Sequence, residues 1–174
     1  MIEHRYSPWE HASRARVGIH WHAKSLPPGA DHAYVPSQET LILRPNLALD
    51  RLTAAAATGL AERDLIQRGP QFGTTSPEEI AAHRLIPLAD LLDAIRRHRG
   101  GVTAVARALG VPTTLVMRRL FTLGPDEARA IDLAAELADP SDSRAVGRVP
   151  TIPLPRPGMT YGPADTLVMH RAAG

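Results

Sequence analysis

The spacing of the apolar residues changes near Pro45, and this change constrains the fold more than any other feature of the sequence. Before Pro45, apolar and polar residues alternate in short runs, a pattern typical of β-strands. The runs are Val17–His22, Ala33–Pro36 and Thr40–Leu43, and Ser37–Glu39 predicts a hairpin loop between the last two. We therefore expect a small antiparallel sheet of about three strands.

After Pro45, apolar residues recur at helical spacing. The first long helix is predicted over Leu47–Gln67, with Asn46 as its N-cap. Ser76–Glu79 then supplies a capping serine, a proline at the first helical position and two early acids for a helix that ends near Leu85. Further helices are predicted over Pro8–Arg16, Leu88–Arg99, Val102–Leu109, Thr113–Leu123 and Pro125–Leu137.

The resulting fold class is α+β, with four segments along the chain. Residues 1–15 form an N-terminal segment, 16–87 the core with the sheet and the long helix, and 88–137 a region resembling a helix-turn-helix. Residues 138–174 form a Pro-rich tail, because the six prolines between 138 and 164 are incompatible with a regular helix or a central strand.

Composition and motif searches exclude several kinds of protein. The chain has no cysteine, which excludes disulfides, thiolate catalysis and cysteine-ligated zinc. No P-loop, dinucleotide-binding glycine motif or nucleophile elbow is present. The N-terminus lacks the apolar core of a signal peptide, and the longest apolar stretch, 52–61, is too short to cross a bilayer. We therefore expect a cytoplasmic protein without a membrane segment or a cofactor.

The segment Ala81-Ala82-His83-Arg84-Leu85-Ile86-Pro87 resembles the A-A-x-x-L-[IM]-P segment of the ImmA/IrrE metallopeptidase family. The order of the predicted elements is also similar, since strand Thr40–Leu43 leads into the helix that carries the H-E-x-x-H motif in that family. The resemblance covers about residues 16–125 and implies the family's sheet and active-site helix.

The resemblance also implies that the zinc site has been lost. In the family, two histidines one turn apart bind zinc and the intervening glutamate is the general base. Here those positions hold Ala56, Leu60 and, at the position of the base, Ala57. The third ligand would fall near Thr75 or Ser76, and neither is acidic. We therefore predict a pseudo-peptidase with no catalytic residue and no metal.

Residues 102–123 have the pattern of a helix-turn-helix, in which small residues and a glycine turn precede the second helix. Arginine and threonine side chains there would contact phosphates or guanine edges. The candidate DNA-binding residues are Arg96, Arg97, Arg99, Arg107, Thr113, Thr114, Arg118 and Arg119. The alternative interpretation is a helical packing module whose arginines are merely solvated.

His20 and His22 lie two residues apart in a predicted strand, so their side chains are expected on one face. Such a pair can chelate a metal, with His32 as a further ligand. The alternative, which we favour, is the solvent-facing side of an edge strand, because no carboxylate lies at a suitable spacing.

The family's members in phages and mobile elements act on helix-turn-helix repressors or stress regulators. The resemblance therefore predicts a non-catalytic regulator that binds a protein partner, such as a repressor, without cutting it. One alternative is a helix-turn-helix transcription regulator that binds DNA through residues 102–123. Another is an accessory subunit that docks on a larger host or phage assembly through its Pro-rich tail.

Overall fold

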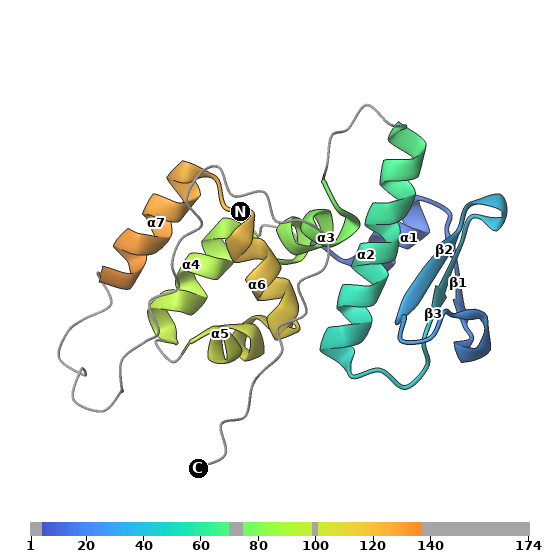
Figure 1. Ribbon diagram of the computed structural model, residues 1–174, viewed down its shortest axis with the longest axis horizontal. Helices are drawn as coiled ribbons and strands as arrows, with labels where there is room; N and C mark the ends of the chain where they lie inside the picture. Colours follow the sequence, from blue (N-terminus) through green and yellow to red (C-terminus); the bar gives the residue numbers. More distant parts are fainter. Residues whose placement is uncertain (1–4, 70–74, 99–100, 137–174) are drawn as a thin grey trace, which may run out of the picture.

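The longest helix, α2 (Leu49–Arg68), separates a small sheet from a group of shorter helices (Figure 1). The computed structural model describes residues 5–69, 75–98 and 101–136. Within these ranges the chain forms seven α-helices and one three-stranded sheet, so the predicted α+β class is confirmed. The predicted Pro-rich tail, residues 138–174, lies outside the described residues.

The sheet has the strand order β1-β3-β2, with β3 in the centre. The strands are β1 (Gly18–Trp21), β2 (His32–Val35) and β3 (Thr40–Leu43). β2 and β3 form the predicted antiparallel hairpin, and a short 3-10 helix, η2 (Pro36–Gln38), lies in its loop. A second 3-10 helix, η1 (Ala23–Ser25), follows β1.

The prediction of an antiparallel sheet is wrong for β1, which pairs with β3 in parallel. The cause is the apolar character of β3, whose Leu41 and Leu43 are completely buried. Burial of both leucines against α2 places β3 in the centre of the sheet. The connection between β1 and β2 lets these two strands lie at opposite edges, with β3 between them. Since β2 and β3 are antiparallel, and β1 runs opposite to β2, β1 and β3 run in the same direction.

Local capping signals fix several helix starts. In α1 (Pro8–Arg14) the Ser7 hydroxyl accepts a hydrogen bond from Glu10 N. In α3 (Pro77–Leu85) Ser76 and Glu79 form a complete capping box, which confirms the predicted start. The predicted cap of α2 is wrong: Asn46 has a left-handed backbone with φ of +63°, and Ala48 occupies the N-cap position.

Four further helices follow α3 and lie on the side of α2 opposite the sheet (Figure 1). They are α4 (Leu88–Arg97), α5 (Val102–Leu109), α6 (Thr113–Phe121) and α7 (Pro125–Glu136). All four were predicted, although α4 and α6 end two residues earlier than expected. The predicted end of the last helix, Leu137, falls outside the described residues.

Two apolar clusters lie on opposite sides of α2. Ala56 and Leu60 pack with Leu41 and Leu43 of the sheet, whereas Ala57 packs with residues of α3 to α6. A helix that contacts both layers needs apolar side chains around most of its circumference, and the alanine-rich centre of α2 supplies them. Because alanine is small, both layers come close to the helix axis.

At Gly59, α2 approaches the sheet closely. A Cβ atom added there would lie 2.3 Å from Leu41 Cδ1 and 3.1 Å from His32 Cδ2. A glycine inside a helix normally lowers stability by about 1 kcal/mol relative to alanine. Here the missing side chain provides the space in which the leucine packs.

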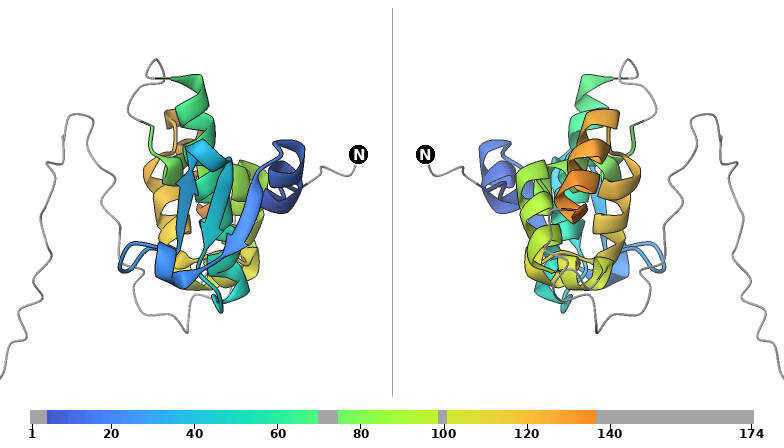
Figure 2. Two further views of the ribbon diagram at one scale, coloured as in Figure 1. Left: turned by 90° about the vertical axis from the view of Figure 1, so that its right-hand side faces the viewer. Right: turned by 90° about the vertical axis from the view of Figure 1, so that its left-hand side faces the viewer.

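The other face of the sheet is not covered by any described helix (Figure 2). Among the described helices, none combines the length and the hydropathy that crossing a bilayer requires.

Candidate nucleic-acid interface

Helices α5 and α6 pack together and are joined by a short turn that begins at Gly110, the order of elements that a helix-turn-helix has. Gly110 ends α5 in the left-handed conformation with φ of +67°, which glycine adopts without strain. Val111 N then donates to Ala106 O at 3.1 Å, and the Val111 side chain is buried between the helices. The turn is therefore fixed both by backbone hydrogen bonds and by an apolar anchor.

Helix α6 has one buried face and one exposed face. Leu115 and Val116 are buried in the cluster of the helical region. Thr113, Thr114 and Arg118 are exposed. Pro112 occupies the N-cap position and Thr113 the first helical position, so α6 begins where the sequence predicted. The exposed face thus carries hydroxyl groups near the start of α6 and a guanidinium further along it.

The charge around these helices has one sign. Between residues 94 and 125 the chain has six arginines and no aspartate or glutamate. Elsewhere the acidic residues outnumber the basic ones, eighteen to fourteen. The whole chain therefore has a formal charge of only +2, although this segment is strongly basic. The small net charge of the whole chain does not indicate a basic segment. The distribution of aspartate and glutamate along the sequence does, because none lies between residues 94 and 125.

Most of the predicted DNA-binding arginines are exposed, and they lie on helices that pack together. Arg96 and Arg97 lie in the last turn of α4, and Arg107 lies on α5, which packs against both α4 and α6. Arg97 pairs with Asp93 one turn earlier. Arg96, Arg107 and Arg118 form no ion pair with any described residue. Arg99 lies outside the described residues.

Arg119 is the exception, and its assignment as a DNA contact is corrected. Only 2% of its surface is exposed. Its Nε donates to Ile86 O at 3.2 Å, and its two terminal nitrogens bind Glu127 at 3.1 and 2.7 Å. The hydrogen bond from Arg119 lowers the pKa of Glu127 to about 2. Arg119 therefore joins α6 to α7 and to the end of α3, and its guanidinium does not face solvent.

The residues at the positions of the zinc motif are all interior. Ala56, Ala57 and Leu60 have no exposed surface, and their neighbours are apolar. Thr75 is exposed, and Ser76 caps α3. Ala56, Ala57 and Leu60 thus form the contacts of α2 with the two layers. The resemblance to the peptidase family, the absence of catalysis and the binding of a protein partner stay predictions.

The three histidines considered as metal ligands point in different directions. His20 pairs with Ile42, and His32 pairs with Leu43, so the two side chains lie on opposite faces of the sheet. His22 Nδ1 lies 2.6 Å from Ser25 Oγ. His32 is next to Gly59 of α2, and burial lowers its pKa. Among the described residues, no group of three or more histidines and carboxylates could hold a metal.

Comparison with known proteins shows a similarity of fold to a solved structure. The sequence matches no protein-family model and no curated protein. A solved structure described as a Mycobacterium tuberculosis transcriptional regulator has a similar fold, with a TM-score of 0.51 and 22% sequence identity. The similarity covers 69% of this chain but only 41% of the regulator, so this chain spans less than half of that protein. At this identity the comparison concerns the fold.

Proposed function

We propose that this protein is a transcription regulator that binds duplex DNA through the exposed face of α6. The observation that carries the proposal is the combination of a helix-turn-helix geometry with a segment of 32 residues, 94–125, that has six arginines and no carboxylate. The fold it shares with a transcriptional regulator supports the same function.

Helix α6 would occupy the position of the recognition helix. In helix-turn-helix proteins, the second helix enters the major groove and its N-terminal residues contact base edges. Thr113 and Thr114 are exposed at that end of α6, where the free backbone N–H groups also favour a phosphate oxygen. Arg118 lies one turn after Thr114 on the same face and has the two parallel donors that a guanine edge requires.

The neighbouring helices would supply contacts to the phosphate backbone. Arg107 on α5 and Arg96 at the end of α4 are exposed and have no described carboxylate partner. Such arginines gain more from a phosphate than arginines already paired in the folded protein, because no existing ion pair has to break. The contacts would be electrostatic and therefore sensitive to salt.

The test is fluorescence anisotropy of a labelled duplex titrated with the protein at several salt concentrations. The proposal predicts binding that weakens steeply with salt, and a loss of about tenfold in affinity for Arg118→Ala. Arg129→Ala is the matched control, because Arg129 is an exposed arginine on α7 outside the basic segment. Equal effects of the two substitutions, or no binding at low salt, would contradict the proposal.

A further inference from the structure

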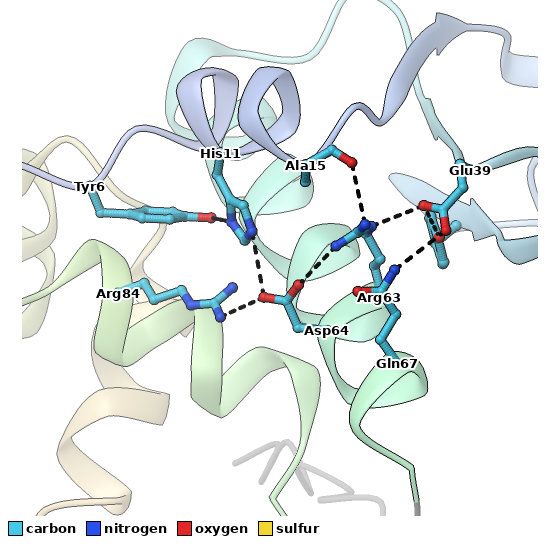
Figure 3. Close-up of polar contacts among 9 residues, drawn as sticks. Tyr6, His11, Ala15, Glu39, Arg63, Asp64, Gln67 and Arg84 are labelled. Carbon is cyan, nitrogen blue, oxygen red and sulfur yellow. Dashed lines mark hydrogen bonds and ion pairs between the residues drawn. The ribbon is translucent and has the colours of Figure 1, made fainter.

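A second group of polar residues lies outside α5 and α6, where α1, α2 and α3 meet. Tyr6 precedes α1, His11 lies on α1, Asp64 on α2 and Arg84 on α3, and their side chains point toward one another (Figure 3). A hollow of about 440 Å³ opens beside them, lined by Tyr6, His11, Arg14, Ala15 and Arg84. The four side chains come from distant parts of the sequence, which is why no local motif predicted this site.

Two hydrogen bonds and one longer polar contact orient the groups around the hollow. His11 Nε2 lies 3.6 Å from Asp64 Oδ2, and its Nδ1 lies 2.9 Å from Tyr6 Oη. With the proton of the neutral imidazole on Nε2, facing the carboxylate, Nδ1 accepts from the Tyr6 hydroxyl. Arg84 Nη2 donates to the same carboxylate at 2.6 Å. Asp64 therefore holds the guanidinium in place and lies beside the imidazole.

One donor of Arg84 is left without a geometrically good acceptor by the described residues. Its Nη1 atom is buried and has no hydrogen-bond partner among the described residues. The Tyr6 ring lies beside the guanidinium, with Arg84 Cζ 5.7 Å from the ring centroid. A buried N–H group without an acceptor is unfavourable, and a guanidinium N–H all the more so. Arg84 is also one of the residues that line the hollow.

Positive charge exceeds negative charge at this place. Asp64 accepts from both Arg84 and Arg63, and Arg63 also pairs with Glu39. Arg14 makes no ion pair with a described residue; its Nε donates only to Glu10 O at 3.4 Å. Two carboxylates, Asp64 and Glu39, thus face the three guanidinium groups of Arg14, Arg63 and Arg84, and an anion would compensate the excess of one positive charge.

We propose that the hollow binds a small oxyanion, a carboxylate or a phosphate group of a soluble ligand, between Arg14 and Arg84. The guanidinium groups supply parallel N–H donors, which is the arrangement that such anions require. Protonation of His11 upon binding would add a third positive group. Neither the proposed contact with DNA nor any residue of α5 or α6 takes part in this site.

An occupant of this hollow would touch the helix that supports α6. His83, next to Arg84 on α3, lies 3.2 Å from Thr122 Oγ1 at the end of α6, and α3 packs along α6. Binding at Arg84 would therefore influence the position of α6 and regulate DNA binding. This consequence rests on the proposed function, whereas binding of the anion does not.

The test is an NMR titration of the whole protein, without DNA, with inorganic phosphate and separately with succinate, at constant ionic strength. The proposal predicts saturable shifts of the Tyr6 and His11 resonances with at least one of the two anions, and the anion that saturates identifies the class. Arg14→Gln should weaken this binding about fivefold, because it removes one exposed charge-assisted contact. Arg129→Gln, the same change on α7, should leave it unchanged.

Arg84→Met provides a second variant, in which the affinity should fall further than in Arg14→Gln. Because Arg84 also binds Asp64, its folding is checked first by the dispersion of the amide spectrum. The exposed Arg14 gives a result even if Arg84→Met does not fold. Shifts that do not saturate with either anion, or equal affinities in Arg14→Gln and Arg129→Gln, would overturn the proposal. Because no DNA is present, such a failure would leave the proposed function untouched.

Discussion

The two halves of the molecule use their arginines differently. Between Asp31 and Asp64 every arginine is paired: Arg44 and Arg51 contact Asp31, and Arg63 contacts Glu39 and Asp64. In residues 75–136, Arg96, Arg107 and Arg118 have no described carboxylate partner and are exposed. Paired arginines hold elements of the fold together, whereas exposed unpaired arginines remain available for a partner.

Arg119 shows that position on the helix, rather than residue type, decides between the two roles. Arg118 and Arg119 are adjacent in the sequence, about 100° apart around α6. Arg119 falls on the same face as Leu115 and Val116, so it is buried and bound to Glu127. Arg118 falls on the exposed face. The two arginines therefore offer the sharpest contrast within the helical half.

The largest expected effect is the loss of stability in Arg119→Met. This change keeps the aliphatic stem but removes the hydrogen bonds to Ile86 O and Glu127, and we expect a loss of about 2–3 kcal/mol in the free energy of unfolding. Urea denaturation measures it. Arg118→Met is the control and should change stability by less than about 0.5 kcal/mol. Similar losses in both variants would break the contrast between the two arginines.

A smaller effect is expected on the sheet side, in Gly59→Ala. The added methyl group would meet Leu41 Cδ1 inside the apolar cluster, and overpacking of this kind costs about 1–2 kcal/mol after the gain in helix propensity. Thermal unfolding measures the change. In a Leu41→Val background, which lacks the contacted carbon, the same substitution should cost less. A gain in stability in the wild-type background would show that α2 and the sheet are not in close contact at Gly59.

The contributions of an unpaired and a paired arginine to DNA binding can be compared by one substitution in each region. Arg107→Gln should lower the affinity for duplex DNA about two- to fivefold and reduce the dependence of log affinity on log salt by about one unit. Arg51→Gln removes an arginine that already pairs with Asp31 and should have little effect on either quantity. Anisotropy titrations at several salt concentrations measure both. A larger effect of Arg51→Gln would place the binding surface on the sheet side.

The smallest expected effect concerns pH. Burial lowers the pKa of His32, with Glu62, Glu78 and Asp31 acting in the opposite direction. The folded protein thus takes up this proton only at lower pH than the unfolded chain does. Stability from this group is complete above the unfolded pKa, near 6.5, and declines as pH falls below it toward the lowered pKa of the folded protein.

In His32→Gln this part of the acid-induced loss should disappear, a change of a few tenths to about 1 kcal/mol. His20→Gln, on the exposed face of the sheet, is the matched control and should behave like the wild type. Denaturation midpoints measured at several pH values give the result. If both variants lose stability with acid as the wild type does, His32 is not protected from solvent by α2.

The sequence predicted those parts of the fold that depend on local chemistry. The cap at Ser76 and the glycine turn at Gly110 are formed by residues within one or two turns of each other, so their patterns are readable along the chain. The parallel pairing of β1 with β3 was missed, because it depends on which strand is most deeply buried. Such a competition involves residues far apart in the sequence.

The candidate interface was predicted in part. The exposure of Thr113, Thr114 and Arg118 follows from helical spacing. The burial of Arg119 could have been predicted in the same way, because Arg119 lies four residues after the buried Leu115. Its partner Glu127, on the next helix, could not be identified from spacing alone. The hollow beside Tyr6 and Arg84 was not predicted, since residues of α1, α2 and α3 form it only in the folded protein.

The most direct test of the account is amide hydrogen exchange of the protein with and without a duplex that it binds. We predict slower exchange on DNA binding in α5, the following turn and the N-terminal half of α6, with little change in the sheet and α1. Slower exchange in the sheet and in α1, with α5 and α6 unchanged, would contradict the claim that the unpaired arginines of the helical half form the binding surface.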